Sequence, residues 1–122
     1  RDFKLINQDN QTVSFFADSG LITVVNFFFT RCPSFCPNMN KELSRVARAY
    51  ERNPLIRFLS ITVDPEHDTP EVLKKYAGQY LAKAGKWTFL TGDKTAIYKL
   101  AQEDFLVDDF IYLILPVWRG FG

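Results

Sequence analysis

Two apolar runs limit most strongly what this chain can fold into. Residues 21–29 read LITVVNFFF and residues 56–62 read IRFLSIT, and both are rich in β-branched or aromatic side chains. Runs of this kind are typical of strands buried on both faces, which occur in sheets covered by helices. The chain has 122 residues, which suffices for one such sheet, so residues 1–122 are predicted to form a single domain.

Helical patterns follow each of these runs. The first predicted helix starts at Pro37, where a missing N–H costs nothing, and continues to about Arg52. Its predicted apolar face consists of Met39, Leu43, Val46 and Tyr50. The second is capped by Thr69, has Pro70 at its first position and stops near Gly85. Its predicted apolar face consists of Val72, Leu73, Tyr76, Ala77, Tyr80 and Leu81.

Shorter elements complete the pattern. Residues 3–7 and 12–16 read as a hairpin, residues 87–90 as a strand, and residues 109–115 as the last strand. A short helix capped by Asp93 lies between the last two. The alternation predicts an α/β fold whose central mixed sheet is flanked by helices, with the runs at 21–29 and 56–62 as parallel neighbours.

Charge and hydropathy exclude several classes of partner. The chain has 15 basic and 14 acidic residues without a basic block, so no nucleic-acid partner is expected. Its longest apolar runs are far shorter than the roughly 20 residues of a membrane helix. The sequence opens at Arg1 without a starting Met, so we expect a trimmed chain from which an upstream anchor or signal has been removed.

The only two cysteines, Cys32 and Cys36, lie in FFFTRCPSFCP, directly after the first strand and at the start of the first helix. Open α/β sheets place their ligand sites at this edge. The positive end of a helix lowers the pKa of a nearby thiol, and thiolates are both nucleophiles and soft-metal ligands.

Three interpretations of the pair remain open from the residues alone. The thiolates could bind Cu(I) or another soft ion together with a third ligand from elsewhere. They could exchange thiols and disulfides, since three intervening residues permit a disulfide. They could also be buried as small hydrophobic side chains. Pro33 and Pro37 stiffen the loop, which a packing role does not require.

Three segments resemble the Sco/SenC family of copper chaperones of cytochrome c oxidase assembly. They read VVNFFFTRCPSFCPNM, LSITVDPEHDTPEVLKKYAGQY and WTFLTGDKTAIYKLAQEDFLV, in the family's order and at its intervals. The resemblance implies a thioredoxin-like fold with an added N-terminal β-hairpin. It also implies that Cys32 and Cys36 bind copper, as Cu(I) or Cu(II), together with a distal histidine.

The resemblance further implies partners and a location. The copper would be delivered to the dinuclear copper site of cytochrome c oxidase subunit II, or the cysteines of that site would be reduced. Other copper chaperones or thiol reductants would be further partners. Family members are usually anchored to a membrane and face the periplasm or the mitochondrial intermembrane space, so this chain would be the soluble part of such a protein.

The distal histidine departs from the family's pattern. In the family it lies after the third helix, but here EDFLVD runs directly into DFIYLIL without a histidine. We expect that a segment carrying this ligand is missing between Asp108 and Asp109. A protein that truly lacked the segment would be a poor copper chaperone.

For the other candidate site residues, a structural role is the preferred interpretation. His67 could stand in as a ligand, but the preferred interpretation is a solvated loop residue beside acidic neighbours. Asp64 and Asp68 are interpreted as fixing the turn and the next helix start. Phe27, Phe28 and Phe29 are expected in the core, alternating between the two faces of a central strand.

The main alternative function comes from another class of protein. A thiol–disulfide oxidoreductase would use Cys32 and Cys36 as its redox-active pair and needs no histidine. A peroxide-reducing thiol enzyme is less favoured, because the longer proline–threonine–cysteine pattern that it requires is absent from the segment around Thr30 and Cys32. The metallochaperone is the preferred interpretation, because three linked segments resemble the family and are more specific than the cysteine pair alone. Transfer would proceed by ligand exchange, so it would not be catalysis in the usual sense.

Overall fold

A computed structural model describes residues 4–14, 21–31, 35–83, 85–100 and 113–117. In this part of the chain, six strands form one sheet in the order β2-β1-β5-β4-β3-β6. The strands are β1 (Lys4–Asn7), β2 (Thr12–Ser14), β3 (Leu21–Phe28), β4 (Ile56–Thr62), β5 (Trp87–Thr91) and β6 (Leu113–Val117). The predicted α/β class and the N-terminal hairpin are confirmed.

The sheet is mixed, as predicted. β3 and β4 are parallel neighbours, and β4 also pairs with β5 in parallel. β1 pairs antiparallel with β2 and β5, and β6 pairs antiparallel with β3. Phe28 stands opposite Thr62 at the carboxyl ends of β3 and β4, so the segments that follow these two strands leave the sheet side by side.

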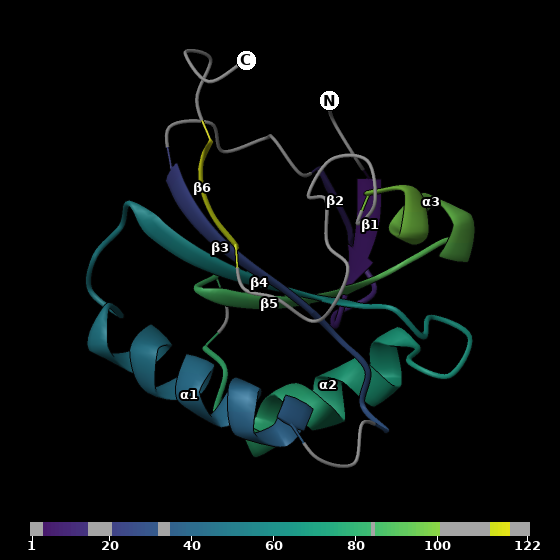
Figure 1. The fold of residues 1–122 in the computed structure, drawn as a ribbon, viewed down its shortest axis with the longest axis horizontal. Coiled ribbons are helices and arrows are strands. Elements are labelled where there is room, and N and C mark those ends of the chain that lie inside the picture. Colours follow the sequence, from purple (N-terminus) through teal and green to yellow (C-terminus); the bar gives the residue numbers. More distant parts are fainter. Residues whose placement is uncertain (1–3, 15–20, 32–34, 84, 101–112, 118–122) are drawn as a thin grey trace.

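Three helices cover the sheet in the described ranges: α1 (Phe35–Ala49), α2 (Pro70–Gln79) and α3 (Lys94–Lys99). Figure 1 shows α1 and α2 together on one face and α3 on the other. The predicted caps are confirmed, because Thr69 accepts a hydrogen bond from the N–H of Val72 and Asp93 accepts one from Ala96. None of these helices is long and apolar enough to cross a membrane.

Each face of the sheet has its own apolar core. Phe27 belongs to the cluster on the α3 side, with Leu5, Ile61 and Ile97. Its neighbour Phe28 belongs to the cluster on the α1 and α2 side, as strand alternation requires. The prediction that these two residues are core residues of a central strand is confirmed.

The first helix differs from its prediction in three respects, one of which is that it ends at Ala49 rather than near Arg52. It begins at Phe35, so Pro37 lies inside its first turn rather than at its first position. The predicted apolar face is also wrong in part, since Val46 and Tyr50 are 37% and 48% exposed. The buried residues of α1 include the polar Asn40 and Ser44 beside Leu43 and Ala47, and the reason lies in the hydrogen bonds of Asn40 described below.

The later boundaries also move. α2 ends at Gln79 rather than near Gly85, because the chain turns at Leu81, which has a φ of 56° and is 68% exposed. Leu81 was therefore wrongly placed on the apolar face. The described part of β6 is Leu113–Val117, which overlaps the predicted strand at 109–115, and residues 109–112 lie outside the described part.

Candidate functional site

The predicted site lies at the edge where β3 and β4 end. Thr30 and Arg31 follow β3 and lead to Cys32, which lies outside the described residues, as do Asp108 and Asp109. Cys36 is the second residue of α1, and its side chain is likewise outside the description. The described surroundings of the two cysteines therefore consist of the end of β3, the start of α1 and the turn after β4.

The start of α1 favours negative charge. Its first turn contains Cys36 and no acidic residue. The unpaired N–H groups and the dipole of a 15-residue helix stabilise an anion at this end. The positive end of a helix favours the thiolate form of a nearby cysteine, and thiolates are both nucleophiles and soft-metal ligands.

The turn after β4 holds the chain just before Cys32 through one buried carboxylate. Asp68 is 0% exposed, and its Oδ2 accepts a hydrogen bond of 3.0 Å from the backbone N–H of Thr30. The same oxygen accepts a bond of 2.6 Å from the hydroxyl of Thr62. Its Oδ1 accepts bonds from the hydroxyl of Thr30 and from Nδ1 of His67, the latter at 2.8 Å.

These donors keep Asp68 ionised. Burial alone would raise the pKa of Asp68, but the hydrogen bonds from Thr30, Thr62 and His67 outweigh it and lower the pKa below its usual value. A folded-state pKa below the unfolded one means that the ionised carboxylate stabilises the fold above the unfolded pKa, which is about 4. That contribution is lost as the pH falls through the folded pKa.

The lowered pKa of Asp68 therefore predicts that the free energy of unfolding depends on pH. Below about pH 4, the free energy of unfolding of the wild-type protein should fall more steeply than that of Asp68→Asn, which has no carboxylate to protonate. Urea unfolding of both proteins from about pH 7 to pH 3, followed by circular dichroism, measures this difference. Parallel curves over the whole range would contradict the assignment.

A second contact joins the same two segments. Nη2 of Arg31 donates to Oδ2 of Asp64 at 2.8 Å, between side chains that are 63% and 27% exposed. Exposed pairs of this kind contribute little free energy. The contact nevertheless holds Arg31, the last residue before Cys32, against the turn.

His67 is more than a solvated loop residue. Its side chain is 39% exposed, but Nδ1 contacts Asp68 and lies 3.4 Å from the hydroxyl oxygen of Thr30. Ligand atoms of Asp64, His67 and Asp68 lie within 4.8 Å of one another. These three groups already have partners in Arg31, Thr30 and Thr62, so the cluster is accounted for by its own hydrogen bonds.

Asp64 and Asp68 were predicted to fix the turn and the next helix start, and the part that concerns the turn is confirmed, because the N–H of Asp68 donates to the backbone oxygen of Asp64. The part that concerns the helix start is wrong for the side chain of Asp68. The helix is capped by Thr69, whereas the carboxylate of Asp68 points back to Thr30 and Thr62. The prediction for Asp64 is confirmed, since its backbone oxygen accepts from the N–H groups of His67 and Asp68 and so closes the turn.

A buried chain of hydrogen bonds fixes α1 against the sheet. It starts at Trp87 in β5 and passes through Ser60 in β4, Asn26 in β3 and Asn40 in α1 to Tyr76 in α2. The donor–acceptor distances in this order are 2.8, 2.5, 3.1 and 2.9 Å. Burial, above all, raises the pKa of Tyr76, so its hydroxyl stays protonated.

This series of buried hydrogen bonds positions the start of α1. Asn40 lies one helical turn after Cys36 and receives its hydrogen bond from the strand that precedes the cysteine loop. All buried side-chain N and O atoms in the described ranges have partners, so breaking one bond would leave a buried polar group unpaired. Sequence reasoning missed these hydrogen bonds. Asn26 could have indicated them, because an amide inside an apolar strand requires a buried hydrogen-bond partner.

Comparison with known proteins gives a family for this architecture. The family described as SCO1/SenC matches residues 1–108. The SCO1 protein homolog of Bacillus subtilis is 33% identical over 105 residues, which cover 84% of this chain and 54% of the homolog. The chain thus spans about half the length of the curated relatives it matches.

Solved structures agree with the sequence comparison. BsSco superposes on this chain with a TM-score of 0.80 at 32% identity. BsSco is a member of the Sco family of cytochrome c oxidase assembly proteins, and a disulfide switch has been identified in it. The match covers 91% of this chain and 66% of BsSco. ScoI of Bradyrhizobium japonicum, solved with copper bound, gives a TM-score of 0.75 at 26% identity and covers 95% of this chain and 78% of ScoI. The predicted thioredoxin-like fold is confirmed by these likenesses.

Proposed function

Since this chain belongs to the SCO1/SenC family, we propose that it is a copper-binding metallochaperone of cytochrome c oxidase assembly. The observation that best supports this function is the start of α1. Cys36 lies there at the positive end of the helix, and the first turn contains no acidic residue. Copper bound to a relative at this TM-score supports the choice of metal.

In this proposal the ligands are Cys32, Cys36 and a histidine. Two thiolates and one imidazole suit Cu(I) in a low-coordinate site, and Cu(II) would recruit a further oxygen or nitrogen donor. The histidine is expected in a segment missing between Asp108 and Asp109. The family match ends at residue 108, which supports a departure from the family's pattern at that point.

The copper is cargo in this function. Thiolates of the recipient would replace those of Cys32 and Cys36 one at a time, so the ion passes between proteins without being released. The proposed recipient is the dinuclear site of cytochrome c oxidase subunit II, with other copper chaperones as sources. The proposed location is the periplasmic face of the bacterial inner membrane or the mitochondrial intermembrane space, where the chain would be the soluble part of an anchored protein.

A thiol–disulfide oxidoreductase is the second candidate, and the disulfide switch of BsSco favours it. One thiolate would attack a partner disulfide, and the second would then displace the partner's sulfur from the mixed disulfide. Two electrons leave the Cys32–Cys36 pair, which becomes a disulfide, while both partner cysteines are reduced. A separate thiol reductant would restore the pair.

One titration tests the proposal. The reduced protein is titrated with Cu(I) in competition with a chelator, and the titration is repeated after oxidation of the pair to a disulfide. We expect one tightly bound ion per reduced chain and none per oxidised chain, because oxidation removes both thiolates of the proposed ligand set. Absence of tight binding, together with rapid reduction of a protein disulfide, would favour the oxidoreductase instead.

A further inference from the structure

The cysteine loop is held at both ends by residues far away in the sequence. At its start, Thr30 and Arg31 are bound by Asp68 and Asp64 of the turn after β4. At its end, α1 is bound to β3 through Asn40. Of the two anchors at the start, the carboxylate of Asp68 is the buried one, at 0% exposed.

Asp68 accepts hydrogen bonds from both the backbone and the side chain of Thr30. Oδ2 takes the backbone N–H at 3.0 Å, and Oδ1 takes the hydroxyl of the same residue. Two contacts fix both the position of the Thr30 backbone and the rotation of its side chain. Cys32 follows two residues later, so its Cα lies within about 7 Å of that of Thr30.

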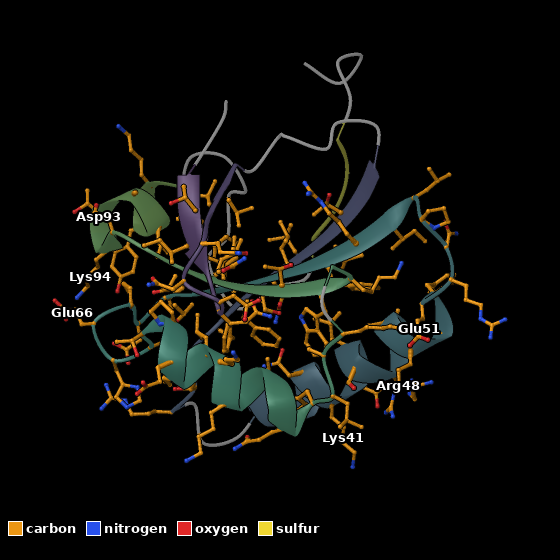
Figure 2. All side chains as sticks on the ribbon, turned by 180° about the vertical axis from the view of Figure 1, so that it is seen from behind. Lys41, Arg48, Glu51, Glu66, Asp93 and Lys94 are labelled. Atoms are coloured by element: carbon orange, nitrogen blue, oxygen red, sulfur yellow. The ribbon has the colours of Figure 1, made fainter. Side chains whose placement is uncertain are left out.

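Asp68 is itself held in place by hydrogen bonds to the end of β4 and within the turn. Thr62, at the end of β4, donates to its carboxylate at 2.6 Å. The turn is closed by hydrogen bonds to the backbone oxygen of Asp64. Glu66 of the same turn lies near Lys94 of α3 (Figure 2). Their Oε1 and Nζ atoms are 3.7 Å apart, and this exposed pair adds little to the support. The carboxylate is therefore fixed to the sheet.

We propose that Asp68 is a positioning residue of the cysteine site, which holds Thr30 so that Cys32 stands at the right distance from Cys36 for both to share one ion or close a disulfide. The copper half of this inference rests on the proposed function, whereas the disulfide half does not. Asp68 touches neither the ion nor the sulfurs in this role and acts through Thr30.

Charge and position make opposite predictions for Asp68. If the charge of Asp68 acted on the two thiols, it would disfavour their thiolate forms, and removal of the charge alone would strengthen copper binding. Loss of position would weaken binding, because the two sulfurs would no longer be preorganised. The sign of the change therefore separates the two effects.

Three variants and one matched control test the inference. Asp68→Ala removes both the charge and the hold on Thr30. Asp68→Asn removes the charge, but its amide oxygen can still accept from the N–H of Thr30. Thr30→Val removes only the hydroxyl contact. Asp93→Ala is the control, since Asp93 also accepts from a backbone N–H, at 3.0 Å, but at the start of α3.

The first measurement is Cu(I) affinity by competition with a chelator. Asp68→Ala should bind about 10–100-fold more weakly than the wild type, the usual loss for partners behind the ligands of a metal site. Asp68→Asn should lose less, and Asp93→Ala should match the wild type. The second measurement, without copper, is the equilibrium with glutathione. The Cys32–Cys36 disulfide should be several-fold easier to reduce in Asp68→Ala, because its thiols have a lower effective concentration.

The outcomes separate this inference from the proposed function. If the wild type fails to bind copper tightly, the proposed function falls and the disulfide equilibrium alone decides on Asp68. If the wild type binds and Asp68→Ala behaves like Asp93→Ala in both measurements, the inference falls and the function stands. Tighter binding by Asp68→Ala and Asp68→Asn would assign the effect to charge and overturn positioning.

Folding of the variants is checked by circular dichroism. If Asp68→Ala does not fold, Asp68→Asn and Thr30→Val decide. Thr30→Val should then bind copper several-fold more weakly, since Asp68 loses the contact that fixes the Thr30 side chain. Wild-type affinity and a wild-type disulfide equilibrium in both of these variants would overturn the inference.

Discussion

Replacing either Cys32 or Cys36 by alanine is expected to weaken Cu(I) binding by a factor of about a hundred or more. Four-ligand zinc sites in small proteins bind with about 10–16 kcal/mol, or roughly 3 kcal/mol for each ligand. A loss of about 3 kcal/mol corresponds to slightly more than two powers of ten in affinity. Each variant keeps only one thiolate, so neither can form the two-sulfur chelate.

The measurement is competition of the reduced variants with a Cu(I) chelator. Ser34→Ala is the matched control, because it makes a change of similar size between the two cysteines and removes no sulfur. It should retain wild-type affinity. If one cysteine variant kept wild-type affinity while the other lost it, the ion would be held by a single thiolate and the proposed chelate would be wrong.

Trp87→Ala is expected to be the most damaging substitution in the core, with a loss of about 3–5 kcal/mol in the free energy of unfolding. The indole is 1% exposed and packs against Phe89, with ring centroids 4.9 Å apart. Its Nε1 donates to the hydroxyl of Ser60 at 2.8 Å. Truncation removes a large apolar surface and breaks the first bond of the buried chain that reaches α1.

Urea unfolding measures this loss, and Trp87→Phe separates its two parts. Phenylalanine keeps most of the ring but loses the donor to Ser60, so it should cost only about 1–2 kcal/mol. Domains of this size are stable by about 5–15 kcal/mol, so the alanine variant should lose about a fifth or more of the total. Equal losses in the two variants would mean that the hydrogen bond, rather than the ring, carries the effect.

The architecture could be predicted from the sequence because it depends on local patterns. The runs at 21–29 and 56–62 carry enough β-branched and aromatic residues to identify buried strands, and the parallel pairing of β3 with β4 followed from the helix between them. The caps Thr69 and Asp93 were recognisable because a cap uses neighbouring backbone N–H groups.

The arrangement around the cysteines could be predicted only in part, because its contacts cross long stretches of sequence. Thr30 and Asp68 are 38 residues apart, and Asn40 and Tyr76 are 36 apart. Asn40 and Ser44 turned α1 away from its predicted face, since a buried amide and hydroxyl bond to Tyr76 and to the backbone of Tyr80. Spacing within one helix carries no information about such partners.

The contact between Thr30 and Asp68 also has a consequence for how the protein is made. During synthesis, both cysteines leave the ribosome more than 30 residues before Asp68 does, and the loop between the two contacts must close before the carboxylate can act. A nascent chain that ends before Asp68 exposes a dithiol whose first half is unanchored. With the proposed role of Asp68, completion of the turn after β4 would be the step at which the thiol pair is positioned, and a chain that stalls earlier would expose two cysteines that Asp68 does not yet hold.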